Sequence, residues 1–127
     1  MGRIGPGLLA LLGVHKDDTD QDVEWMVQKV PHLRIFDDDA GKMNHSLVDT
    51  GGGLLVVSQF TLYGDAAKGR RPNFMDAMGP APAAALIDQL VARLRATGLT
   101  VATGQFRATM EVALVNAGPV TLVLDSR

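Results

Sequence analysis

The sequence contains no cysteine, one tryptophan, one tyrosine and no long uninterrupted apolar run. Without cysteine, disulfides, thiolate catalysis and cysteine-ligated zinc are excluded. The apolar stretch near the N-terminus is interrupted by Gly5, Pro6 and Gly7, and its remainder is too short to cross a membrane. No small-residue cleavage site of a signal peptide follows it. We therefore predict a buried strand here, and a cytoplasmic protein without membrane contact.

An excess of positive charge is also missing, because 12 lysines and arginines face 14 aspartates and glutamates, for a net charge of −2. Proteins that wrap nucleic acid are usually strongly basic, so any contact with RNA must be local, and no DNA partner is expected. The densest basic spot contains Lys68, Arg70 and Arg71. Few aromatic residues are available as a stacking platform for single-stranded nucleic acid.

Several common signatures of active sites do not occur. The sequence has no phosphate-binding glycine loop, no zinc-protease helix motif and no nucleophile elbow. Asp37, Asp39 and Gly41 loosely resemble a calcium loop, but Val48 stands where the twelfth-position glutamate belongs. We interpret these aspartates as a solvated turn, and we expect neither a metal nor a cofactor.

The chain of 127 residues, 46% of them apolar, suits one domain over residues 1–127. A first helix is predicted after the acidic Asp17–Asp22 stretch, capped by Thr19 or Asp20 and stopped by Pro31. A second carries the apolar stripe of residues 86–94 and ends at Gly98. The predicted strands cover residues 8–14, 33–36, 54–62, 99–103, 109–115 and 120–124. This order indicates a mixed α/β domain.

Two segments are unusual for ordinary strands and turns. Residues 54–57 read as a core strand, which then ends in Ser58-Gln59-Phe60-Thr61. Polar groups at the end of a buried strand are either the floor of a pocket or a strand that frays into solvent. The second segment is Asn116-Ala117-Gly118-Pro119-Val120-Thr121, between two apolar strand patterns. Proline there belongs on an edge or a bend, and a plain hairpin turn is the alternative.

Together these segments resemble the signature of the D-aminoacyl-tRNA deacylases, whose members carry a Ser-Gln-x-Thr strand end and an Asn-x-Gly-Pro-Val-Thr segment. Ala117 and Asn73 depart from the aspartate and serine that are common in that family. Family members usually begin with a further strand and hairpin, so the resemblance implies a chain shortened at its N-terminus. Stretches of the chain that also look like family positions are residues 5–13, 34–36, 41–44, 69–74 and 103–106.

The resemblance implies a mixed sheet or partial barrel packed with two main helices, in a homodimer. It implies hydrolysis of D-aminoacyl-tRNA, and of mischarged glycyl-tRNA, at the tRNA acceptor end. It also implies that a cis Gly118-Pro119 pair enters the pocket of the other subunit and rejects L-amino acids. The catalytic group would be Ser58, Gln59, Phe60 and Thr61. The supporting residues would be Asn116, Val120, Thr121 and Met110.

Two roles stay open at this point. Thr61 would need a neighbouring base to act as a nucleophile, and none is evident, so a positioning role for Thr61 and Ser58 is favoured. Lys68, Arg70 and Arg71 are candidates for contact with tRNA phosphates, or they belong to a solvated loop. The competing functions are a non-catalytic nucleotide- or nucleic-acid-binding homodimer of the same fold and a small dimerising scaffold.

Overall fold

The computed structural model describes residues 2–127. Its centre is a three-stranded parallel sheet of β1 (Gly7–Leu12), β4 (Gly53–Ser58) and β5 (Thr100–Thr103), with β4 in the middle. Leu55 of β4 faces Leu9 of β1 and Ala102 of β5 in register. The central strand β4 holds the buried residues, whereas β1 is only half-buried and its Leu11 is exposed, so the predicted buried strand near the N-terminus is a strand but is not buried on both faces.

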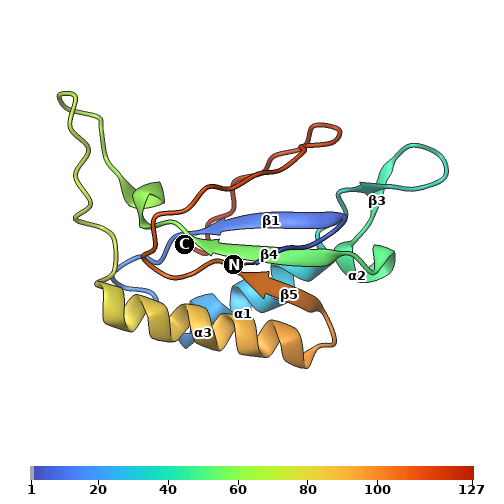
Figure 1. Cartoon of the computed structure of the whole chain (residues 1–127), viewed down its shortest axis with the longest axis horizontal. Helices are drawn as coiled ribbons and strands as arrows, with labels where there is room; N and C mark the ends of the chain where they lie inside the picture. The colour runs from blue at the N-terminus through green and yellow to red at the C-terminus, as the bar shows by residue number, and fades with distance from the viewer. Residues whose placement is uncertain (1) are drawn as a thin grey trace.

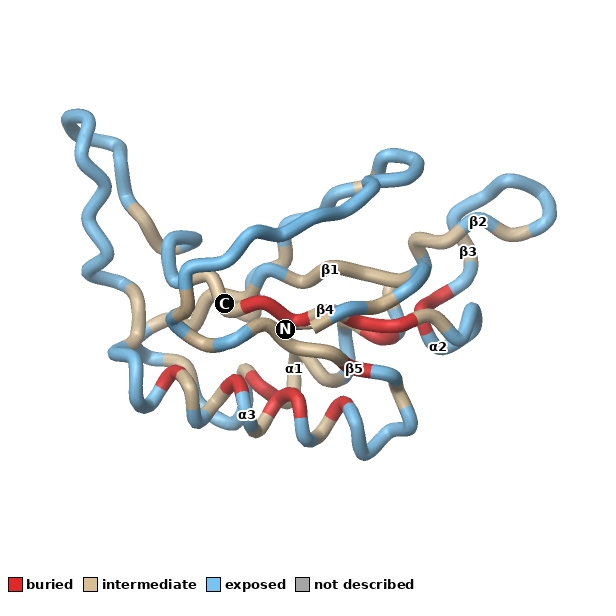
Figure 2. Tube along the Cα trace, viewed as in Figure 1, coloured by how far each residue is buried: buried red, intermediate tan, exposed pale blue. Residues whose placement is uncertain are grey.

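Two helices lie against one face of the sheet (Figure 1). They are α1 (Asp20–Lys29) and α3 (Pro80–Ala96), and they pack against each other. The core forms between α3 and alternate residues of β4, with Leu54, Val56, Ile87 and Leu94 buried. Figure 2 shows this concentration of buried residues in β4 and along the inner side of α3.

Smaller elements complete the body. A 3-10 turn η1 (Val30–His32) follows α1 and contains the buried Pro31, so α1 ends at Lys29 as predicted. β2 (Phe36–Asp37) and β3 (Met43–His45) form a separate antiparallel pair, followed by the short helix α2 (Leu47–Thr50). No helix among residues 2–127 is long and apolar enough to cross a membrane.

The predicted strand over residues 33–36 is wrong in extent, because only Phe36 belongs to β2. The predicted strand over residues 54–62 is too long as well. It ends at Ser58, where Gln59 donates its backbone N–H to Leu12 O at 2.8 Å. The chain then bends into a 3-10 turn, η2 (Phe60–Tyr63). Ser58 therefore stays in the sheet as the last residue of β4, whereas Gln59 and Thr61 lie beyond its end.

The predicted strands over residues 109–115 and 120–124 are also wrong for the described chain. This segment is an extended, largely exposed hairpin that lies on the opposite side of β1 and β4 from the helices (Figures 1 and 2). Apolar alternation is not sufficient for a strand, since its backbone groups also need a neighbouring strand to pair with. Leu114, Val115, Leu122 and Val123 are accordingly exposed.

Candidate active site

The first part of the candidate site is the corner where β4 passes into η2, formed by Ser58, Gln59, Phe60 and Thr61. Ser58 and Gln59 are half-buried, whereas Phe60 and Thr61 are exposed. The Gln59 side chain donates a hydrogen bond from Nε2 to Thr61 Oγ1. The turn is closed by hydrogen bonds from Leu62 N to Gln59 O (3.2 Å) and from Gly64 N to Thr61 O (2.9 Å).

This corner leaves backbone donors free. The first N–H groups of a helical turn have no partner within it, and in η2 these belong to Phe60 and Thr61. Neither donates a hydrogen bond to another group in residues 2–127. They lie beside the Thr61 hydroxyl, which the Gln59 amide holds in place. The corner therefore offers adjacent N–H donors, suited to an oxygen that carries negative charge.

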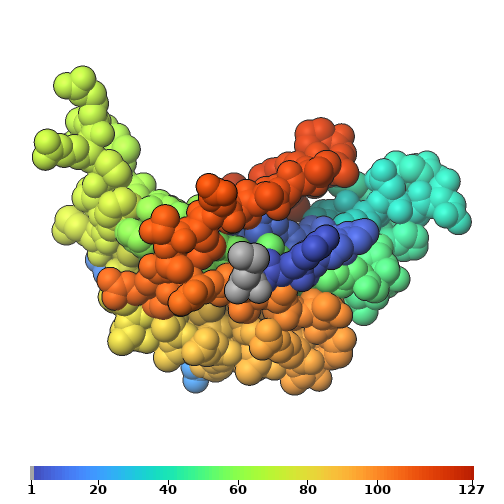
Figure 3. All heavy atoms as spheres, viewed as in Figure 1, coloured from blue at the N-terminus to red at the C-terminus, as the bar shows by residue number. Residues whose placement is uncertain are grey.

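Phe60 connects the corner to the loop over residues 64–79. Its ring meets Phe74 edge to face, with the ring centres 5.0 Å apart. The loop is pinned at its base by paired backbone bonds between Asp65 and Asn73, 2.7 and 2.9 Å long. Its far end projects away from the body (Figure 3). Lys68, Arg70 and Arg71 are all exposed there.

The second part of the candidate site is the tip of the 109–124 hairpin. Asn116 Nδ2 donates to Thr121 Oγ1 at 3.0 Å, and Val120 N donates to Asn116 Oδ1 at 3.3 Å. This clamp encloses Gly118 and Pro119, which are joined by a cis peptide bond. Gly118 has a φ of 123°, which side-chain-bearing residues rarely adopt, and a Cβ there would lie 3.2 Å from Val120 Cγ2.

The structure brings some of the predicted site residues together and keeps others apart. Met110 lies over Gly104, close to Val57 and thus near the end of β4. The Gly118–Pro119 tip, in contrast, points away from the corner of its own chain: the two lie well separated in Figure 1. The two predicted parts of the site therefore do not meet within a single chain.

The chain matches, over residues 1–125, the family model described as D-Tyr-tRNA(Tyr) deacylase. The chain belongs to this deacylase family. The resemblance predicted from the two motifs is thereby confirmed. A relative from Myxococcus xanthus (strain DK1622), named D-aminoacyl-tRNA deacylase, is 64% identical over 123 residues, which are 97% of this chain and 80% of the relative.

Two further deacylase-family comparisons carry different names. A Bacillus subtilis (strain 168) relative named inactive D-aminoacyl-tRNA deacylase is 54% identical over 127 residues, which are 100% of this chain and 96% of that protein. The solved structure of a c-Myc DNA Unwinding Element Binding Protein matches with a TM-score of 0.90 and 39% identity, over 98% of this chain and 85% of that one. The deacylase-family fold is therefore confirmed.

The contacts of several residues near the deacylase motifs were not predicted from the sequence. Phe74 contacts the ring of Phe60 at the start of η2, and His15 contacts the ring of Tyr63 at its end. A cavity of about 370 Å³ opens beside Ser58, between the ends of β4 and β5 and α3. Ring pairs between segments distant in sequence leave no local pattern, so only the fold could reveal them.

Proposed function

We propose that this protein hydrolyses the ester bond of D-aminoacyl-tRNA, releasing the D-amino acid and tRNA, and that it does so as a homodimer. The observation that carries the proposal is the pair of half-sites described above. The Ser58–Thr61 corner presents free donors, and the clamped Gly118–Pro119 tip is exposed and directed away from that corner. A second copy of the chain is the natural source of the missing half, because closed dimers repeat one contact twice.

In the reaction, water adds to the ester carbonyl carbon, the bond to the ribose oxygen breaks, and a proton passes to that oxygen. The Phe60 and Thr61 N–H groups, with Gln59, stabilise the oxyanion that forms on the carbonyl oxygen. Losing one such donor typically costs ~10²–10³ in rate. The Thr61 hydroxyl is engaged by Gln59, and no base contacts it in residues 2–127. Thr61 and Ser58 therefore position groups, and the terminal ribose 2′-hydroxyl helps to activate water.

The tip supplies the selection for D-amino acids. Its main-chain carbonyls accept hydrogen bonds from the substrate ammonium, while Asn116 and Thr121 keep the tip in shape. With the ammonium and the ester carbonyl both held, the Cα substituents have only two places. Backbone of the tip occupies the one that an L side chain needs, so selection works by exclusion. Glycine lacks a side chain, and glycyl-tRNA is therefore hydrolysed as well.

The exposed basic loop contacts phosphates of the tRNA acceptor end through Lys68, Arg70 and Arg71. Three cations in a chain of net charge −2 imply few phosphate contacts. The salt dependence of binding should then be shallow, because the slope of log K against log salt scales with the number of phosphates neutralised. The protein acts in the cytoplasm, where tRNA is aminoacylated and used.

The test is hydrolysis of matched D- and L-aminoacyl-tRNA prepared from the same tRNA and amino acid. The proposal expects release of the D-amino acid, survival of the L ester, and release of glycine from glycyl-tRNA. Equal rates on the D and L esters would overturn the selection by the tip. If neither ester is hydrolysed, the enzymatic proposal itself is overturned.

A non-catalytic nucleic-acid-binding homodimer is the second candidate. The observation in its favour is the 0.90 TM-score to a protein named for binding a DNA element. The net charge of −2 and the scarcity of aromatic residues weigh against an extended nucleic-acid surface. In the same assay a binder would shift both aminoacyl-tRNAs in a gel and cleave neither.

A further inference from the structure

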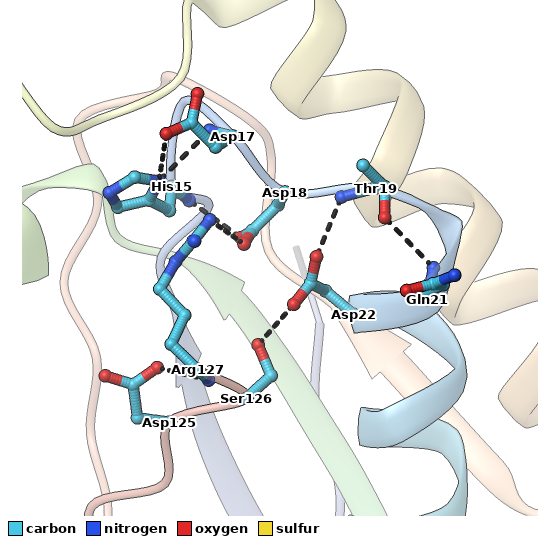
Figure 4. A network of polar contacts seen from close by, with 9 residues as sticks. All are labelled: His15, Asp17, Asp18, Thr19, Gln21, Asp22, Asp125, Ser126 and Arg127. Carbon is cyan, nitrogen blue, oxygen red and sulfur yellow. Dashed lines mark hydrogen bonds and ion pairs between the residues drawn. The ribbon is translucent and has the colours of Figure 1, made fainter.

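A chain of contacts outside the two motifs connects residues 125–127 to the candidate corner. It lies where the segment after β1, the start of α1 and residues 125–127 meet (Figure 4), beside a cavity that Tyr63 of η2 also lines. Its members are His15, Asp18, Tyr63 and Arg127. None of them belongs to the Ser58–Thr61 or Asn116–Thr121 motif.

Asp18 is the centre of this chain, because each of its carboxylate oxygens has a separate partner. Oδ1 accepts a hydrogen bond from the Arg127 guanidinium at 2.8 Å, and Oδ2 accepts one from His15 N at 2.8 Å. Only 12% of the Asp18 side chain is exposed. Hydrogen bonds that involve a charged group are stronger than neutral ones, so Asp18 holds Arg127 and the His15 backbone together.

His15 links Asp18 to η2. Its ring lies edge-on to Tyr63, with the ring centres 5.4 Å apart, and its Nδ1 accepts a hydrogen bond from Asp17 N at 3.0 Å. Tyr63 is the last residue of η2. Its ring also covers Gly13, where a Cβ would lie 3.0 Å from Tyr63 Cε2. Burial, and then the nearby Asp18 and Asp125 carboxylates, raise the pKa of the Tyr63 phenol, as expected for a ring inside this cluster.

The turn η2 is thus held by a ring at each end, Phe60 against Phe74 and Tyr63 against His15. Between them lie the Phe60 and Thr61 N–H groups that the proposed function uses. The hydrogen bonds within a 3-10 turn of four residues have poor geometry, so outside contacts help to determine where those donors point.

We propose that Asp18 is a positioning residue for the active corner, acting through His15 and Tyr63 on η2 and held in place by Arg127. This inference rests on the proposed hydrolytic function for its effect on rate. Its structural part, the ordering of η2, stands independently. The side chains act at a distance from the ester, so their loss should lower kcat more than it raises KM.

The experiment compares Asp18→Asn with Glu24→Gln, which neutralises a carboxylate in α1 that pairs with Arg93 of α3, away from η2. Hydrogen exchange is followed at Leu62 and Gly64, whose N–H groups close the turn. Asp18→Asn should accelerate their exchange about tenfold through local opening, and Glu24→Gln should not. The kcat for D-aminoacyl-tRNA should fall on the order of tenfold in Asp18→Asn, below the ~10²-fold that a 1 Å misplacement can cost.

Two further pairs of variants separate positioning from general stability. Arg127→Lys keeps a cation near Asp18 and should retain most of the kcat and of the protection from hydrogen exchange that Arg127→Ala loses. Tyr63→Phe keeps the ring against His15 and loses only the phenol interaction with Arg127, so it should stay much closer to wild type than Tyr63→Leu, which should match Asp18→Asn. This second pair keeps the proposal testable even if Asp18→Asn does not fold.

The outcomes distinguish this proposal from the proposed function. If the wild-type protein hydrolyses no aminoacyl-tRNA, the proposed function fails, and the exchange rates still decide whether Asp18 orders η2. Exchange at Leu62 and Gly64 that is the same in Asp18→Asn and Glu24→Gln would overturn the ordering. Faster exchange with an unchanged kcat would overturn its role in the reaction.

Discussion

At the scale of single residues, short polar contacts shape both halves of the proposed site. Gln59 reaches two residues along the chain to the Thr61 hydroxyl, and Asn116 reaches four and five residues to Val120 and Thr121. Asparagine and threonine side chains readily make hydrogen bonds to groups nearby in the chain. The motif residues therefore fix the backbone, whose groups are the ones that we propose face the substrate.

Thr61→Ala tests this reading at the reacting centre. The variant loses the hydroxyl that holds Gln59, so the oxyanion donors become less ordered, and we expect kcat to fall by roughly 10- to 10²-fold, less than the loss of a whole donor. Thr61→Ser keeps the hydroxyl and should stay near the wild-type rate. Single-turnover assays on D-aminoacyl-tRNA measure both. A Thr61→Ala variant reduced to the uncatalysed rate, together with an acyl-enzyme trapped on wild type, would make Thr61 the nucleophile.

At the scale of elements, the sequence predicts those features whose cause is local. Thr19 caps α1, as expected from its position before an acidic first turn, and Gly98 stands in a left-handed conformation just after α3. The end of β4 was not predictable, because it depends on the bond from Gln59 to Leu12 O in a distant strand. The strands predicted within residues 109–124 were wrong for the same reason, because apolar alternation does not show which strand, if any, a segment pairs with.

The cap of α1 yields a pH prediction. Asp22 Oδ2 accepts from Thr19 N at 2.8 Å, and Oδ1 accepts from Ser126 Oγ at 2.8 Å. The Thr19 bond, and then the Ser126 bond, lower the pKa of the Asp22 carboxyl from its ordinary 3.8. A carboxyl with a lowered folded-state pKa stabilises the fold above its unfolded pKa. That stability is lost as pH falls through the lower folded value.

Asp22 is the N3 partner of the capping residue Thr19, so Asp22→Asn should lower the free energy of unfolding at pH 7 by about 1 kcal/mol, a loss of the size typical at helix N-termini. The difference from wild type should begin to shrink as the pH falls below 3.8, where the carboxyl of the unfolded chain takes up its proton, and it should vanish once the pH lies below the lowered folded-state pKa. Urea unfolding of both proteins at a series of pH values measures this difference in the free energy of unfolding. Asp20→Asn, in the same first turn, is the control and should change stability less. An Asp22 effect that persists undiminished in acid would contradict this assignment.

At the scale of the whole molecule, two exposed segments project from the body of the domain. The hairpin over residues 109–124 stands out from the body with Val115 and Val123 more than 90% exposed. Apolar exposure of this extent is typical of an interaction surface. The basic loop over residues 64–79 projects as a second arm (Figure 3). We infer that the hairpin faces protein and the loop faces tRNA.

Subunit mixing tests whether the tip acts across a dimer. Gly118→Ala strains the tip, because the φ of 123° at this position disfavours a side chain. Gln59→Ala disrupts the corner. Each variant alone should therefore lose hydrolysis of D-aminoacyl-tRNA. In a mixed dimer, the corner of the Gly118→Ala chain meets the intact tip of the Gln59→Ala chain. Random exchange makes half of the dimers mixed, each with one intact site of two, so activity should return to roughly a quarter of wild type.

The readout is the D-aminoacyl-tRNA hydrolysis rate before and after unfolding and refolding the two variants together, with the dimer mass verified by light scattering. Refolding each variant alone is the control for recovery without exchange, and it should stay inactive. A tip that served its own chain would leave every mixed dimer with two damaged sites, and the mixture would then regain nothing. Because complementation depends only on which chain supplies which half, this result separates a site shared across two subunits from one completed by movement of the hairpin within a single chain.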